Sequence, residues 1–303
     1  MCHAKAGLYF SLREHLRCRD GALLFGCLGR GASAQSGLMA KAHIAKSSDD
    51  DLAIGGDVEG LPPRGPRYLS REDLLTLPQV TYTVTDDANF ARPTEITGVS
   101  LEDLIRSAAH DPDADLVIAI CSDGYHAHYM HSYLSRHHPL LVLKINGQPP
   151  ERWPTDAEGH GQSMGPYLIS HRKFAPGFKI LAHQEEAQIP WGVMALEFRN
   201  EKKFLAAIAP AREASDPPVE AGYRIAQQNC VRCHNLGDVG GQKARHPWLV
   251  LSAWAKASPE RFAAYVRNPQ AENPQAEMPA NPNYDAATLR ALVAYFQTFQ
   301  SSH

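Results

Sequence analysis

The sequence predicts two folded domains, a mixed α/β domain over residues 52–205 and an all-α domain over residues 219–303. In the first part of the chain, short apolar runs alternate with helix-capping sequences, which is typical of α/β structure. In the last part, apolar residues recur every three or four positions, as on one face of a helix. Residues 206–218 between them contain Pro210, Pro217 and Pro218 and are predicted to be a linker.

The composition excludes some classes of protein. A chain of 303 residues is long enough for two hydrophobic cores. Its formal net charge of −3 gives no reason to expect a nucleic acid as partner. No apolar stretch approaches the roughly 20 residues that a membrane-spanning helix needs. We therefore expect a globular protein without a transmembrane segment.

Residues 1–34 have the features of an export signal. Arginines precede a short apolar run at residues 22–28, and Ala32-Ser33-Ala34 forms a small-residue cleavage site. An alternative is a lipoprotein signal ending at Cys27, although Phe25 is bulky for that motif. Residues 35–51 are polar and are expected to form a flexible lead-in, with ordered structure beginning near Leu52.

Strands of the first domain are predicted from their apolar patterns. Residues 79–85 alternate polar and apolar side chains, which indicates a half-buried strand. Residues 116–121 form a continuous apolar run, which indicates a strand buried on both faces. Further strands are expected at residues 125–130, 140–145 and 191–198.

Two short helices of the first domain are predicted from their starts. Ser70 with Asp73, and Ser100 with Asp103, have the spacing with which a hydroxyl and a carboxylate cap the first turn of a helix. The first helix should stop before Pro78, and the second should run to about residue 109.

The second domain begins and ends with a helix. The first carries Val219, Gly222, Tyr223 and Ala226 at helical spacing. The last opens at Asp285, a good N-cap, and its apolar face consists of Leu289, Leu292, Val293, Phe296 and Phe299. Because Gly222 has no side chain, the two helices can cross closely there, with Tyr295 or Phe296 filling the contact.

Cys230-Val231-Arg232-Cys233-His234 is the c-type haem attachment pattern. Two thiols must reach the two vinyl groups on one porphyrin edge, and the following imidazole must reach the iron. A dithiol redox pair or a zinc site would also use such cysteines, but a zinc site needs two further ligands. Since covalent haem c is made outside the bacterial cytoplasm, this motif and the export signal together predict a periplasmic protein.

The sixth ligand of the haem iron is predicted to be Met278. It is the only methionine after Met194, and Pro279 stiffens the loop that would hold its thioether. A His/Met pair raises the reduction potential compared with two imidazoles. The alternative ligand is His246.

The crossing of terminal helices, the Cys230–His234 motif and the late Met278-Pro279 together resemble the class I cytochrome c family over the whole of residues 219–303. The resemblance implies one covalent haem c and a role in electron transfer.

The first domain resembles the molybdopterin-binding domain of the sulfite oxidase family over about residues 52–199. Four segments carry the resemblance: 69–78, 97–105, 122–125 and 145–149. That family places its molybdenum-ligating cysteine in the segment that matches Thr85–Phe90, which contains no cysteine here. Cys121 is the only remaining thiol of the domain and lies in an apolar run. We therefore expect this fold without molybdopterin, serving as a docking module.

His126, His128 and His131 surround Tyr129 and Met130. In a strand, His126 and His128 share one face, where neutral imidazoles can ligate copper, zinc or a second haem iron. The alternative is a polar strand edge whose histidines bond to backbone or water. His160, His171 and His183 could join such a site.

The sequence therefore favours an electron carrier over an enzyme. We expect the protein to take an electron from a periplasmic dehydrogenase and to pass it to a cytochrome or oxidase. A first alternative is an enzyme in which the front domain oxidises a small substrate at molybdenum or at a histidine-bound metal. A second is a haem sensor or structural subunit.

Overall fold

The computed structural model describes residues 41–57, 65–108, 113–155, 161–210 and 216–299. The predicted export signal lies outside the described residues. Within the described ranges, no helix is both long enough and apolar enough to cross a membrane.

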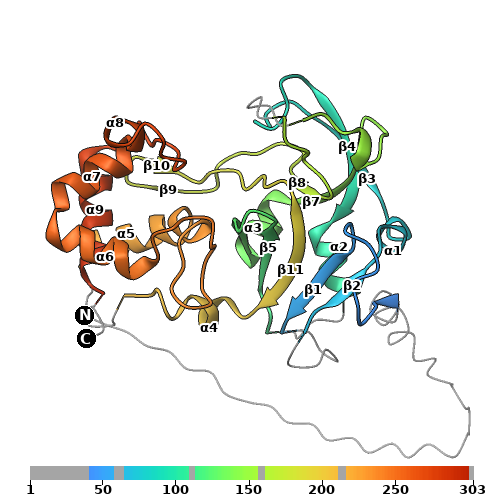
Figure 1. Cartoon of the computed structure of the whole chain (residues 1–303), viewed down its shortest axis with the longest axis horizontal. Helices are drawn as coiled ribbons and strands as arrows, with labels where there is room; N and C mark the ends of the chain where they lie inside the picture. Colours follow the sequence, from blue (N-terminus) through green and yellow to red (C-terminus); the bar gives the residue numbers. More distant parts are fainter. Residues whose placement is uncertain (1–40, 58–64, 109–112, 156–160, 211–215, 300–303) are drawn as a thin grey trace, which may run out of the picture. The chain divides into compact units, whose positions relative to one another are not determined.

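A five-stranded sheet forms the first layer of the α/β domain (Figure 1). Its strand order is β2-β1-β11-β5-β6, and only β1 and β11 run parallel. The strands are β1 (Leu52–Gly56), β2 (Arg67–Leu69), β5 (Leu116–Cys121), β6 (His126–Met130) and β11 (Val193–Arg199). The strands predicted at residues 116–121, 125–130 and 191–198 are thus confirmed, and β5 is almost wholly buried, as its apolar run predicts.

A four-stranded antiparallel sheet forms the second layer, with the order β3-β4-β7-β8. Its strands are β3 (Val80–Val84), β4 (Thr94–Ser100), β7 (Leu140–Ile145) and β8 (Leu168–Ser170). After β7 the chain turns at Asn146 and Gly147, which both have positive φ, as a tight Asn-Gly turn requires.

Helices of this domain begin where the capping residues predict. In α1 (Arg71–Leu75), Ser70 and Asp73 form a capping box. In α2 (Leu101–Ser107), the Ser100 hydroxyl accepts a hydrogen bond from the Asp103 N–H. The remaining elements are α3 (His131–His137), the 3₁₀ turn η2 (Pro150–Arg152), the hairpin β9 (Lys179–Ile180) and β10 (His183–Gln184), and α4 (Glu201–Leu205).

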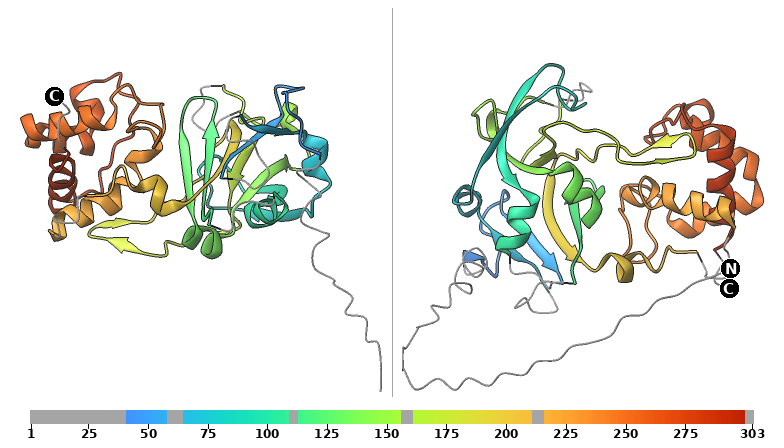
Figure 2. Two further views of the ribbon diagram at one scale, coloured as in Figure 1. Left: turned by 90° about the horizontal axis from the view of Figure 1, so that it is seen from below. Right: turned by 180° about the vertical axis from the view of Figure 1, so that it is seen from behind.

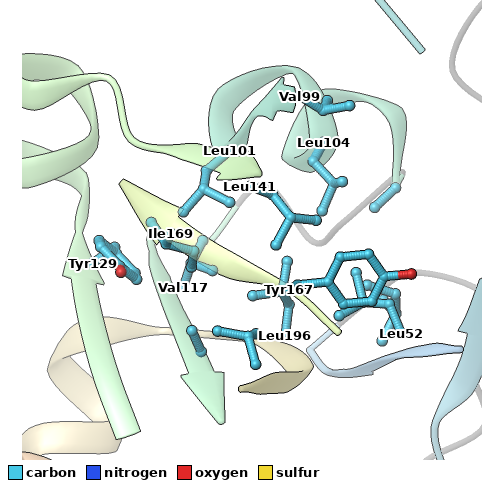
Figure 3. Close-up of a cluster of buried hydrophobic side chains, with 14 of the residues drawn as sticks. Leu52, Val99, Leu101, Leu104, Val117, Tyr129, Leu141, Tyr167, Ile169 and Leu196 are labelled. Carbon is cyan, nitrogen blue, oxygen red and sulfur yellow. The ribbon is translucent and has the colours of Figure 1, made fainter. Parts of the chain in front are cut away.

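The main core of the α/β domain lies between the sheets and helices (Figure 3). Leu141 of β7 points into this core beside Leu196 of β11 and Leu104 of α2. Its neighbours Leu140 and Val142 belong to a smaller core on the other face of the second sheet. The period of two along β7 therefore supplies both cores from one strand.

Two boundaries differ from the sequence prediction. His43 pairs with Tyr68, and the buried Asp51 accepts hydrogen bonds from Ser47 and Ser48, so ordered contacts begin before Leu52. A helix already starts at Pro217, within the predicted linker, because proline fits the first turn of a helix, where its missing N–H is not needed.

Five helices make up the last part of the chain (Figures 1 and 2). They are α5 (Pro217–Ala226), α6 (Trp248–Ala257), α7 (Pro259–Arg267), α8 (Pro269–Glu272) and α9 (Ala286–Gln297), with the 3₁₀ turn η3 (Cys230–Arg232) after α5. Helix α9 opens at its predicted N-cap, Asp285, whose carboxylate accepts from the Thr288 N–H at 2.8 Å.

The first and last helices cross at Gly222. A β-carbon at this position would overlap the Ala291 carbonyl group and would lie 2.7 Å from the Cβ of Tyr295. The close crossing expected from the sequence is confirmed, and Tyr295 fills the contact. Both Tyr295 and Phe296 are buried there.

Candidate haem-attachment site

The cysteines of the motif lie on η3, directly after α5. The Asn229 N–H donates to the Ile225 carbonyl, and the His234 N–H donates to the Cys230 carbonyl at 3.0 Å, so the chain leaves α5 as a compact turn. Cys230 and Cys233 are free thiols and are half-buried. Burial raises the pKa of Cys230 to about 12. Burial also raises the pKa of Cys233, so both thiols are protonated at neutral pH.

The imidazole of His234 is held by its Nδ1 atom. Nδ1 lies 2.6 Å from the carbonyl oxygen of His246, which can only accept, so Nδ1 carries the proton. Burial lowers the pKa of His234, which favours the neutral ring. The tautomer thus leaves the Nε2 lone pair available for a metal, in the manner of metal-binding histidines whose other nitrogen bonds a carbonyl.

A tight loop after His234 supports this arrangement. Gly240 has φ +97°, and a β-carbon there would overlap the His234 carbonyl oxygen. The Gly241 N–H donates to the Val231 carbonyl at 2.8 Å, and the Trp248 N–H donates to the Asn235 carbonyl at 2.7 Å. Gly240 and Gly241 are needed for this backbone packing, because a β-carbon at Gly241 would overlap the Arg232 carbonyl oxygen.

Met278 lies in the irregular segment between α8 and α9 and is half-buried. The Gln270 side chain donates to the carbonyls of Ala276 and Met278, at 2.8 and 2.9 Å. Asn281 donates to the Val266 carbonyl at 2.9 Å. These bonds give the methionine loop a defined backbone without regular secondary structure.

Aromatic residues pack close to the motif. The Tyr284 hydroxyl accepts from Asn229 at 2.7 Å, next to Cys230 in the chain. Trp248 is buried against Phe296, with ring centroids 5.0 Å apart. Trp254 and Tyr265 pack edge to face, with ring centroids 5.0 Å apart.

Residues of the α/β domain also contact the motif, which sequence reasoning missed. The Gln242 N–H donates to the Gly124 carbonyl at 2.8 Å, and Lys243 forms an ion pair with Asp123 at 2.7 Å. His183, on the β9–β10 hairpin, lies 3.0 Å from the side chain of Asn229. Charge complementarity between Lys243 and Asp123 was the only signal in the sequence, and charged pairs of this kind are too common to be predictive.

Two of the three predicted metal-binding histidines lie close together. His126 and His128 occupy one face of β6, with ring centroids 6.2 Å apart. His128 is buried and burial lowers its pKa to about 3. His131 instead is exposed at the start of α3. Across the described ranges, no three His, Cys, Asp or Glu side chains are grouped so that they could hold a metal ion.

The other histidines have separate partners. His171 bonds the Tyr133 hydroxyl at 3.0 Å, His137 bonds Glu185 at 3.0 Å, and His138 bonds Glu102 at 2.8 Å. His160 lies outside the described residues.

Asp87 occupies the segment Thr85–Phe90, where the resembled family has its molybdenum ligand. Its buried carboxylate accepts hydrogen bonds from the Ser170 hydroxyl and from the Asn89 N–H. Burial raises the pKa of Asp87. Cys121, the free thiol of the α/β domain within the described residues, is 5% exposed, and burial raises its pKa to about 12.

The residues at the motif fit a covalently attached haem. Two thiols and an imidazole with an available Nε2 are what covalent attachment and one iron ligand require, and a thioether such as that of Met278 is the second ligand of a His/Met haem. This fit depends on the residues of one domain only.

Comparison with known proteins identifies this domain. Residues 217–296 match the family model described as cytochrome C oxidase, cbb3-type, subunit III. This part of the chain is a cytochrome c domain, which implies haem c as the cofactor and electron transfer as its role.

Comparisons of the whole chain with solved structures and with curated proteins do not identify a family for the α/β domain. The chain is similar to a solved structure titled sulfane dehydrogenase SoxCD from Paracoccus pantotrophus, with 18% identity and a TM-score of 0.35. The match covers 52% of this chain and 40% of that chain, so it spans less than half of that chain's length. A search of the curated proteins gave no match.

Proposed function

We propose that this protein is a periplasmic c-type cytochrome that carries single electrons through one haem, attached at Cys230 and Cys233 and ligated by His234 and Met278. The observation that carries the proposal is the hydrogen bond from Nδ1 of His234 to the His246 carbonyl. It fixes the tautomer that a metal-binding histidine needs, immediately beside two free thiols.

The roles of the residues follow from their chemistry. Cys230 and Cys233 would each form a thioether, which would tether the cofactor to η3. His234 and Met278 would hold the iron. When bound, the haem supplies a reversible one-electron change at its iron. With two protein ligands there is no open coordination position for a substrate, so this arrangement favours electron transfer over catalysis at the iron.

The position of His246 supports Met278 as the sixth ligand. The His246 carbonyl bonds Nδ1 of His234, on the side of the imidazole that faces away from an iron at Nε2. The methionine loop is a separate segment with its own backbone support, so it could supply the sixth ligand.

The α/β domain is proposed to be a sulfite oxidase-like module without molybdenum, which docks the cytochrome to its partners. A periplasmic dehydrogenase would be the electron donor, and a cytochrome or oxidase the acceptor. In support, the segment Thr85–Phe90 contains no cysteine, and the Asp87 carboxylate within it accepts hydrogen bonds from the Ser170 hydroxyl and the Asn89 N–H.

The ligand assignment is tested by spectroscopy of three variants. The oxidised wild type should show the weak near-infrared band of sulfur-to-iron charge transfer, as the family resemblance implies. Met278→His should abolish the band and lower the potential, because imidazole favours the oxidised iron. Met278→Ala should abolish the band and admit exogenous ligands. His246→Ala is the control and should keep the band. Absence of the band from the wild type, with a Met278→Ala spectrum unchanged, would overturn the assignment.

A further inference from the structure

Arg232 is a buried charge within the haem-attachment motif. It is the last residue of η3, one position before Cys233 and two before His234. The residue is only 9% exposed. Since an arginine guanidinium stays protonated in proteins, a full positive charge is buried beside the thiols that would hold the haem.

The α/β domain supplies the neighbours of this charge. Tyr125, just before β6, lies beside the guanidinium. Glu186, which follows β10, lies 3.8 Å from Nη1, but its side chain is 52% exposed. Nε and Nη2 of Arg232 are buried and have no hydrogen-bond partner among the described residues. The positive charge is therefore only partly compensated.

A charge in this setting acts on the iron more strongly than a charge in solvent. Coulombic interactions are weakened by the high dielectric constant of water and by salt, and much less so for buried groups. A positive charge disfavours the oxidised iron, which carries one positive charge more than the reduced iron. A buried Arg232 should therefore favour the reduced state.

We propose that the buried positive charge of Arg232 raises the reduction potential of the haem and thereby tunes electron transfer. The inference rests on the proposed attachment of haem at this motif. Tyr125 and Glu186 both lie beside the guanidinium, so the α/β domain would help to set the potential of the cytochrome domain.

Glu186 should act in the opposite direction. Its carboxylate faces the same guanidinium and offsets part of the positive charge. It also lies 3.8 Å from Nδ1 of His183, whose pKa is lowered by burial, so that this ring is neutral at neutral pH. Removal of the Glu186 charge should therefore raise the reduction potential, whereas removal of the Arg232 charge should lower it.

The test is a potentiometric titration of the full-length holoprotein and four variants at neutral pH and low salt. Arg232→Gln should lower the midpoint potential, and Glu186→Gln should raise it. Arg232→Lys keeps the charge and should stay much closer to the wild type than Arg232→Gln. The control is Arg261→Gln, since the Arg261 side chain is 69% exposed and pairs with Glu272 far along the chain from the motif. It should leave the potential unchanged.

A role in folding alone would give a different pattern. Arg232→Lys would then shift the potential as much as Arg232→Gln, and Glu186→Gln would not shift it upward. Either result, or an unchanged potential in Arg232→Gln, would overturn the proposal. Each preparation is first checked for covalent haem. Loss of haem from the wild type would refute the proposed function, whereas an unshifted potential in a haem-loaded variant would refute only the role of Arg232.

Discussion

Gly222→Ala should destabilise the cytochrome domain although alanine is the better helix former. In an exposed helix the exchange would stabilise by about 1 kcal/mol. Here the added β-carbon would overlap the Ala291 carbonyl group of α9 and would lie 2.7 Å from the Cβ of Tyr295. These atoms belong to the backbone or are bonded to it, so they cannot move without moving the helix, whereas the end of a flexible side chain can.

The magnitude follows from two opposing contributions. Overpacking of a close-packed contact costs about 1–3 kcal/mol, and the upper end applies because α9 must move as a whole. Subtraction of the helix-propensity gain leaves a net loss of about 2 kcal/mol. The loss arises mainly from looser packing of Tyr295 and Phe296, which are buried at this crossing.

Urea unfolding followed at the haem absorption measures the free energy of unfolding of this domain. The control is Gly55→Ala in β1, where the nearest neighbour of the new β-carbon is the Glu197 Cγ at 3.8 Å, an ordinary contact. The control should unfold like the wild type. A Gly222→Ala variant as stable as the wild type, or more stable, would show that the two helices do not cross this closely.

Three further predictions concern the α/β domain and the thiols. Cys121 is buried, and burial raises its pKa to about 12. In the holoprotein that begins at residue 35, iodoacetamide should therefore label no cysteine in the native state and only Cys121 after denaturation. Labelling of the motif cysteines in the denatured holoprotein would argue against thioethers. Burial raises the pKa of Asp87, so this group stabilises the fold at low pH and the contribution is lost as pH rises through the folded pKa. Asp87→Asn, which can keep both hydrogen bonds, should therefore gain stability relative to the wild type between about pH 4 and pH 7 in thermal unfolding, and a difference that is independent of pH would contradict this. Metal analysis should find iron but no stoichiometric molybdenum, and equal contents of the two metals would refute the docking role.

Features that depend on neighbouring residues could be predicted from the sequence. Ser70 and Ser100 cap their helices through side chains three residues away. The haem motif is contiguous, and the apolar periods of β5 and α9 are local. The crossing at Gly222 was predictable as well, because only glycine permits so close an approach.

Features that depend on distant contacts were not predictable in this way. Arg232 is buried beside Tyr125 and Glu186, which lie far away in the sequence. Ile180 of the β9–β10 hairpin belongs to the core of the cytochrome domain, although its own segment carries no apolar pattern that indicates this. The prolines at 217 and 218 suggested a linker, yet they begin α5, since proline is equally suited to a first helical turn.

The central claim is that haem is bound covalently at Cys230 and Cys233. Acid-acetone extraction of the purified protein, followed by the pyridine haemochrome spectrum of the precipitated polypeptide, tests it most directly. One haem per chain should stay with the wild-type polypeptide, and the Cys230→Ala/Cys233→Ala variant should release its haem into the solvent. Extraction of the haem from the wild type, or its retention by the double variant, would contradict the claim.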